Sequence, residues 1–238
     1  MKTEDSQYSQ YLENKYLPGR SLYLSRIFYP KLFRAFRTPD PIIDLGCGTG
    51  EFLKYCRRKK REAIGVDSNE ELARKCRNKG LDVLKDSICE LTSLKGRQFK
   101  YAICDNVLEH LGLEALNRFF ERMDSLLLSE GTLTCIVPGI RGFETDPTHK
   151  TFISESVLSN LLSKRALRIT NYYFHPFNFR NLDRYFYLNM QVFEISTTSA
   201  AGKTLLHTLS NSAPVRQAVE SDRQSLQQVS DKVSGRFS

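Results

Sequence analysis

The chain has 238 residues, of which 40% are hydrophobic, and it carries a formal net charge of +8. This length allows one α/β domain with its own core and a small appendage. No apolar run is long enough to span a bilayer. The polar start of the sequence is not that of a secretory signal, so we expect a cytoplasmic protein without a transmembrane segment.

Six cysteines are scattered through the first two thirds of the chain, and no two of them form a C-x-x-C pair. This spacing argues against a cysteine-bound zinc ion and against a redox dithiol, and we expect no metal. Several cysteines lie in apolar, strand-like runs, where a free cysteine behaves as a small hydrophobic residue. Such usage is typical of a reducing cytoplasm. The six are Cys47, Cys56, Cys76, Cys89, Cys104 and Cys135.

The first segment, residues 1–38, has Tyr, Phe and Leu at roughly helical spacing, interrupted at Pro18 and Gly19. We expect two short helices that form a lid over one edge of a sheet. Strand-like and helix-like segments then alternate, which is typical of a parallel sheet covered by helices. Strands are predicted at 41–45, 62–67, 81–86, 99–106 and 132–139, and helices at 51–58, 69–80 and 114–131.

A last antiparallel strand pair is predicted from about residue 171, which completes a domain over residues 39–196. The polar tail, residues 197–238, is expected to be disordered or to form one helix over Val215 to Val233. The oligomeric state is left open.

The stretch PIIDLGCGTGEFL, from Pro41 to Leu53, places three glycines between a predicted strand and a predicted helix. Glycine can adopt positive φ and lets another molecule approach the backbone closely. A turn here directs backbone N–H groups and the positive end of the helix dipole into a crevice. The G-x-G-x-G spacing of Gly46, Gly48 and Gly50 is neither the dinucleotide fingerprint nor a P-loop.

Acidic residues follow the next predicted strands. Ligands of an open α/β sheet bind at the carboxyl ends of its strands, where these residues lie. Asp67 can accept hydrogen bonds from both hydroxyls of a ribose, although it could instead cap the following helix. Asp86 can accept from an exocyclic amine. The stretch DNVLEHL, from Asp105 to Leu111, adds apolar and polar groups that face the cleft. Glu109 and His110 are candidate catalytic residues, although polar residues that begin such a segment commonly cap it or pair locally.

The successive stretches IIDLGCGTGEFL, AIGVDSN, VLKDSI and FKYAICDNVLEHL resemble, in order and spacing, the motifs of class I S-adenosylmethionine-dependent methyltransferases. This resemblance implies a Rossmann-like, doubly wound α/β fold, with a seven-stranded, mostly parallel sheet, and S-adenosyl-L-methionine as the cofactor. It also implies that the glycine turn lies against the methionine part, Asp67 at the ribose, Asp86 and Ser87 at the adenine, and Asn106 near the sulfonium. The cofactor-binding residues expected are Asp44, Gly46, Cys47, Gly48, Gly50, Asp67, Ser68, Asp86, Ser87 and Asn106.

A second cluster lies in the long loop after the fifth predicted strand, from Val137 to Ser154. Its stretch DPTHKTFIS resembles one found in bacterial sugar and polysaccharide methyltransferases. We expect His149 to act as a base or to position the acceptor, with Asp146 orienting its ring and His110 nearby. The alternative is that Asp146 forms an Asx turn on which His149 packs.

These observations favour an enzyme that methylates an oxygen or nitrogen of a small molecule, with a sugar or glycolipid intermediate as the candidate acceptor. The alternatives are an RNA or protein methyltransferase and a regulatory protein that binds the cofactor without catalysis. The basic run from Arg57 to Glu62 lies at a helix end, where cations complement the helix dipole. Because no nucleic-acid-binding motif accompanies it, a nucleic-acid partner is not expected.

Overall fold

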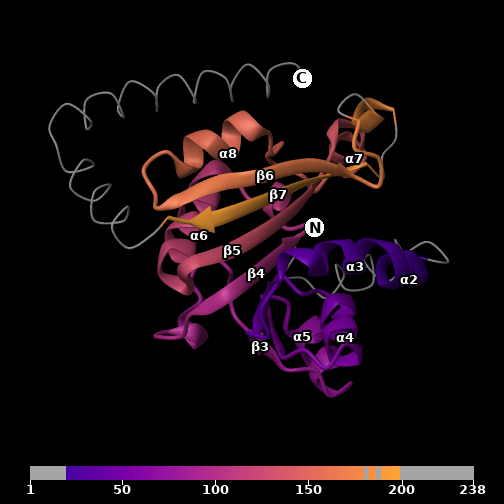
Figure 1. Cartoon of the computed structure of the whole chain (residues 1–238), viewed down its shortest axis with the longest axis vertical. Helices are drawn as coiled ribbons and strands as arrows, with labels where there is room; N and C mark the ends of the chain where they lie inside the picture. The colour runs from indigo at the N-terminus through magenta and orange to yellow at the C-terminus, as the bar shows by residue number, and fades with distance from the viewer. Residues whose placement is uncertain (1–19, 180–181, 186–188, 199–238) are drawn as a thin grey trace, which may run out of the picture.

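The computed structural model describes residues 20–179, 182–185 and 189–198. Within this part of the chain, one seven-stranded sheet has the order β3-β2-β1-β4-β5-β7-β6 (Figure 1). β1 to β5 pair in parallel, and β7 runs antiparallel to both of its neighbours. The predicted Rossmann-like fold is therefore confirmed, including the antiparallel strand pair. The strands are β1 (Ile42–Leu45), β2 (Ala63–Asp67), β3 (Val83–Lys85), β4 (Phe99–Asp105), β5 (Leu127–Pro138), β6 (Leu167–His175) and β7 (Met190–Thr197).

Helices cover both faces of the sheet and bury its alternating side chains. α6 and α8 pack on one face, where Phe119, Phe120 and Leu158 contact the strands. α4 and α5 lie on the other face, and Gly65 in β2 allows Leu53 of α4 to approach the sheet. The two layers hold β1 in the fully buried centre, as expected of a central parallel strand. The helices are α2 (Arg20–Tyr23), α3 (Tyr29–Leu32), α4 (Glu51–Arg58), α5 (Glu70–Arg77), α6 (Leu113–Leu126), α7 (Ile140–Glu144) and α8 (Glu155–Leu162).

The boundary between α6 and β5 differs from the prediction, which continued the helix to Gly131. α6 ends at Leu126, and Leu127 is already paired with Phe99 of β4. Leu127 is fully buried there, so pairing in the sheet outweighs the helical preference of the sequence. An irregularity in the pairing follows, and the N–H of Gly131 donates to Thr197 Oγ1 at 3.0 Å.

The described part of the predicted lid belongs to the core. A π-helical turn, Leu24–Phe28, connects α2 to α3. Phe28, Tyr29 and Leu32 are buried against α4 and the adjacent face of the sheet. Tyr23, at the end of α2, lies near the carboxyl edge, where burial and nearby Asp105 raise the pKa of its hydroxyl to about 12. Its function as a lid stays a prediction.

The remaining predictions concern the tail, membranes and cysteines. β7 ends at Thr197, where the tail was predicted to begin, and residues 199–238 lie outside the described residues. Among the described helices, none has the length and apolar character needed to cross a membrane. All six cysteines are buried and reduced, and burial raises the pKa of each thiol.

Replacing Phe28 by Ala tests whether the N-terminal segment is core. We expect the free energy of unfolding to fall by about 3–5 kcal/mol, because the substitution removes a buried ring. Ile27, its neighbour in sequence, is 55% exposed, so Ile27→Ala should change this free energy by no more than about 0.5 kcal/mol. Urea denaturation followed by circular dichroism measures both, and equal effects would contradict the packing.

Candidate functional site

The glycine turn connects the buried β1 to α4 through three residues in the left-handed region. The φ angles of Gly46, Gly48 and Gly50 are +79°, +51° and +73°. A Cβ at Gly46 would lie 2.4 Å from a methyl of Val107, so the turn is pressed against the segment that follows β4. A Cβ at Gly48 would meet no atom within 4 Å. Gly48 therefore presents bare backbone to open space at the edge of the sheet.

Asp67, at the end of β2, holds the glycine turn in place. Its Oδ2 accepts from the N–H of Gly48 at 2.8 Å, and its Oδ1 accepts from the N–H of Asn69 at 2.8 Å. The cap of α5 is Asn69, whose side chain accepts from the N–H of Leu72. The alternative interpretation of Asp67 as the helix cap is therefore wrong, and its carboxylate lies beside the bare backbone of Gly48.

Three carboxylates converge at the carboxyl ends of β1, β2 and β4. Burial raises the pKa of Asp44 well above its usual value, and the negative charges of Asp105 and Asp67 raise it further. Burial also raises the pKa of Asp67, although hydrogen bonds from the N–H groups of Asn69 and Gly48 oppose the increase. Because like charges repel at short range, this edge favours a cationic ligand.

Asp86 is occupied by the protein itself. Its carboxylate accepts from the N–H groups of Ser87 and Ser93 and from the hydroxyl of Ser93, each at 2.7 Å. Thr92 Oγ1 lies at 3.3 Å. Burial would raise the pKa of Asp86, but these hydrogen bonds outweigh it and leave the pKa below its usual value. The carboxylate thus organises the turn around the predicted adenine site.

Three further residues predicted to bind the cofactor differ in which of their groups a ligand could contact. Asn106 is exposed at the end of β4, in the left-handed region at φ 56°, and its Nδ2 donates to Asp105 Oδ1 at 2.7 Å. Ser68 is half-buried beside Asp67. The thiol of Cys47 is buried against Gly65, so this residue can offer a ligand only its backbone.

The second predicted cluster forms after β5, in a segment that contains the short helix α7. Asp146 Oδ1 accepts from the N–H of Thr148 at 2.9 Å, which is the Asx turn considered as an alternative. The ring of His149 is oriented by Phe143, whose carbonyl oxygen accepts from Nδ1 at 2.9 Å. Asp146 Oδ2 lies 3.8 Å from His149 Nε2. Asp146 therefore contacts the ring, but it does not hold the Nδ1 proton.

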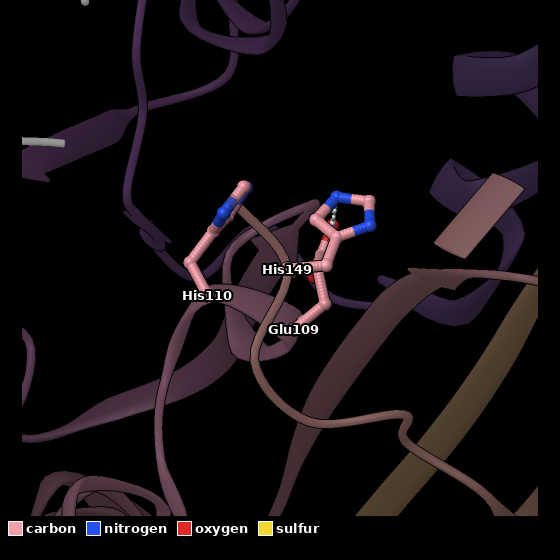
Figure 2. A group of neighbouring side chains, drawn as sticks. All are labelled: Glu109, His110 and His149. Atoms are coloured by element: carbon pink, nitrogen blue, oxygen red, sulfur yellow. Dashed lines mark ion pairs between the residues drawn. The ribbon is translucent and has the colours of Figure 1, made fainter. Parts of the chain in front are cut away.

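Glu109 and His110 lie in the same cluster, on a 3-10 turn after β4 (Leu108–His110). Figure 2 shows the rings of His110 and His149 side by side, with Glu109 beneath them; the ring centroids are 4.9 Å apart. Glu109 is 1% exposed, and its Oε1 lies 3.9 Å from His149 Nε2. The sequence indicated Glu109 and His110 as candidate catalytic residues, whereas the proximity of Glu109 to His149 depends on the fold.

Backbone hydrogen bonds join the two segments of this cluster. The carbonyl oxygen of Glu109 accepts from the N–H of Lys150 at 2.7 Å and from that of Thr151 at 3.1 Å. The hydroxyl of Thr151 donates to the carbonyl oxygen of Leu111 at 2.7 Å. The relative positions of Glu109 and His149 are thus set by ordered backbone.

The basic run at the end of α4 binds the protein's own backbone. Arg57 Nη1 donates to the carbonyl oxygen of Lys79 at 2.7 Å. Arg61 donates to the carbonyl oxygens of Asp40, Phe36 and Thr38. These contacts give two of the cations a structural role.

Comparison with known proteins agrees with this geometry. Residues 42–131, which include the glycine turn, Asp67 and the turn after β4, match the family model described as a methyltransferase domain. This match and the fold together support a class I S-adenosylmethionine-dependent methyltransferase. A search of curated proteins finds no match to the sequence.

Several solved structures share the fold at low sequence identity. A SAM-dependent methyltransferase from Archaeoglobus fulgidus is 22% identical, with a TM-score of 0.65, covering 82% of this chain and 100% of that chain. A protein from Pyrococcus horikoshii OT3 is 15% identical, with a TM-score of 0.64 and the same coverage. Magnesium protoporphyrin IX methyltransferase from Synechocystis PCC 6803, crystallised with SAH, is 12% identical, with a TM-score of 0.60, covering 82% of this chain and 96% of that chain.

Replacing Asp86 by Asn tests its role in the methyltransferase domain. Because folding lowers the pKa of Asp86, its carboxylate stabilises the fold at pH values above the ordinary pKa of an aspartate. This stabilisation is lost as the pH falls through the lower pKa of the folded state. We expect Asp86→Asn to lower the free energy of unfolding at pH 7 by about 1–3 kcal/mol. The difference from the unsubstituted protein should shrink below about pH 4.

Chemical denaturation across this pH range measures the effect. Asp82→Asn is the control, because Asp82 is exposed just before β3. A difference for Asp86→Asn that does not vary with pH would contradict a role for the charge.

Proposed function

We propose that the protein transfers a methyl group from S-adenosyl-L-methionine to an oxygen or nitrogen of a small-molecule acceptor, with a sugar or glycolipid intermediate as the candidate acceptor. The observation that carries this proposal is the bare backbone of Gly48 beside the carboxylate of Asp67, at the carboxyl ends of β1 and β2. Ligands of open α/β sheets bind at this edge.

The residues at this edge fit the cofactor. S-adenosyl-L-methionine, when bound, supplies a methyl group activated by a positively charged sulfonium. The clustered carboxylates of Asp44, Asp67 and Asp105 are complementary to such a cation, because it would offset the repulsion that adds to burial in raising the pKa of Asp44. Asp67 is proposed to bind the ribose hydroxyls, and Asn106 to lie near the reacting end.

The adenine site is proposed at the turn that Asp86 organises. Since the Asp86 carboxylate already accepts several hydrogen bonds from the protein, its capacity for an exocyclic amine is limited. Ser87 and the backbone around it are then the surface against which the base packs. Asp86 acts here chiefly by fixing the shape of that surface.

His149 is proposed to remove the proton of the acceptor. The Phe143 carbonyl oxygen can only accept, so Nδ1 of His149 carries the ring proton and the lone pair lies on Nε2. A neutral imidazole in this tautomer can take a proton from a hydroxyl as the oxygen attacks the methyl carbon. The bound cofactor would supply the methyl group, and its sulfur would keep the electron pair of the carbon–sulfur bond. Alignment of the acceptor and exclusion of water provide the rest of the rate enhancement.

Calorimetric titration with S-adenosyl-L-methionine tests the cofactor site. We expect the unsubstituted protein to bind the cofactor and Asp67→Asn to bind roughly 10–100-fold more weakly. A hydrogen bond to a charged group contributes about 1.5–3 kcal/mol, and 1.4 kcal/mol corresponds to tenfold in affinity. Asp82→Asn, which also removes one negative charge, should bind like the unsubstituted protein. Equal loss in both variants would indicate a long-range charge effect and contradict the ribose contact.

Replacing His149 by Gln tests the base. We expect turnover, measured as release of S-adenosylhomocysteine in the presence of acceptor, to fall by roughly 10²–10⁴. Cofactor affinity should stay unchanged, because the cofactor contacts proposed above come from other segments. Unchanged turnover with an acceptor would exclude this role for His149.

An acceptor screen separates the remaining alternatives. Methylation of RNA with strongly salt-dependent binding would favour a nucleic-acid substrate. Binding of the cofactor without transfer to any class of acceptor would favour a regulatory protein. The backbone contacts of Arg57 and Arg61 support the small-molecule acceptor, since those side chains are already engaged.

A further inference from the structure

We propose that Glu109, His110 and His149 bind a divalent first-row transition-metal ion beside the methyl acceptor. This inference rests on the proposed function and changes one part of it, since the ion, instead of His149, activates the acceptor in the same transfer. The three side chains come from two segments, the turn after β4 and the segment between α7 and α8 (Figure 2). One ligand atom from each lies within 4.8 Å of the others.

The histidine tautomers favour metal binding. Nδ1 of His149 donates to the Phe143 carbonyl oxygen, as described above. Nδ1 of His110 lies 3.3 Å from the Thr148 carbonyl oxygen and 3.2 Å from Thr148 Oγ1, whose own proton is donated to Asp146 Oδ1. Both neighbours of this Nδ1 therefore accept. Both rings then have their lone pair on Nε2, the arrangement of metal-binding histidines whose other nitrogen is held by backbone.

Distances and burial are compatible with a shared ion. Two ligands that are each about 2.1 Å from one ion can be at most about 4.2 Å apart. The distance of 3.9 Å between Glu109 Oε1 and His149 Nε2 satisfies this limit. The widest separation in the group exceeds it by less than about 1 Å, which small side-chain rotations can close. The carboxylate of Glu109 is buried, where a cation beside it would interact strongly with its charge.

The ligand types restrict the identity of the ion. Two imidazoles and one carboxylate suit ions such as Mn²⁺, Co²⁺ or Zn²⁺, whereas Mg²⁺ and Ca²⁺ prefer oxygen ligands alone. Three protein ligands leave positions for an acceptor. The early expectation of no metal considered cysteine ligands, and all six cysteines are buried thiols.

The ion would change how the acceptor loses its proton. A hydroxyl bound to a divalent metal ion has a lowered pKa, so its proton can pass to water. The resulting oxygen attacks the methyl carbon, the carbon–sulfur bond breaks, and sulfur keeps the electron pair; the products are the methyl ether, S-adenosylhomocysteine and the released proton. With the ion bound, His149 acts as a ligand and the ion replaces it as the means of activating the hydroxyl.

Direct metal titration of the full chain, purified without a histidine tag and treated with chelator, tests the proposal in the absence of cofactor. We expect one Co²⁺ per chain by calorimetry, with visible absorption bands that report bound nitrogen and oxygen ligands. Loss of a residue that only supports a metal ligand costs roughly 10–100-fold in affinity, so loss of a ligand should cost at least tenfold. Glu109→Gln and His110→Gln should both show this loss.

Glu114→Gln is the matched control, because Glu114 is exposed on α6, where it pairs with Arg118. Circular dichroism identifies a variant that fails to fold. If Glu109→Gln fails to fold, His110→Gln still tests the proposal, because His110 is only half-buried. Absence of stoichiometric Co²⁺, Mn²⁺ and Zn²⁺ binding, or equal binding by His110→Gln and the control, would overturn the proposal. Cofactor titration of the same samples reports separately on the proposed function, since its site is formed by other residues.

Discussion

The close approach between the glycine turn and Val107 is the constraint on which the arrangement of the site depends. Gly46 has room for no side chain there, and its N–H donates to the carbonyl oxygen of Val66 at the end of β2. The turn is thereby fixed to β2 on one side and packed against the segment after β4 on the other. Because only Leu108 separates Val107 from Glu109 and His110, the same contact relates the cofactor edge to the second cluster.

The second consequence of this constraint is electrostatic. Parallel strands place their carboxyl ends at one edge, so three acidic residues from separate strands come together there. The resulting repulsion opposes folding, while it prepares the edge for a cation. Such conflict between stability and binding is common at functional sites. The hydrogen bonds that Asp67 accepts from Gly48 and Asn69 partly offset it.

The sequence allowed much of the fold to be predicted, because local signals agreed with the tertiary structure. The three glycines, the alternation of apolar segments and the acidic residues after strands all have direct physical meanings, and β1, α4 and β4 lie where they were expected. The start of β5 was missed, since Leu127 joins the sheet only through its pairing with Phe99. Proximity of Glu109 to His149 could not be inferred either, because residues far apart in the chain meet only after folding.

The six buried cysteines allow local and global unfolding of the chain to be followed by thiol labelling. A thiol reacts with alkylating reagents as the thiolate and only when reagent can reach it, and both conditions fail in the folded state. Labelling must therefore wait for local or global unfolding. Cys47 lies in the glycine turn, whereas Cys104 and Cys135 lie on paired strands in the centre of the sheet. Their relative labelling rates would separate loosening of the cofactor edge from unfolding of the core, without the introduction of further cysteines.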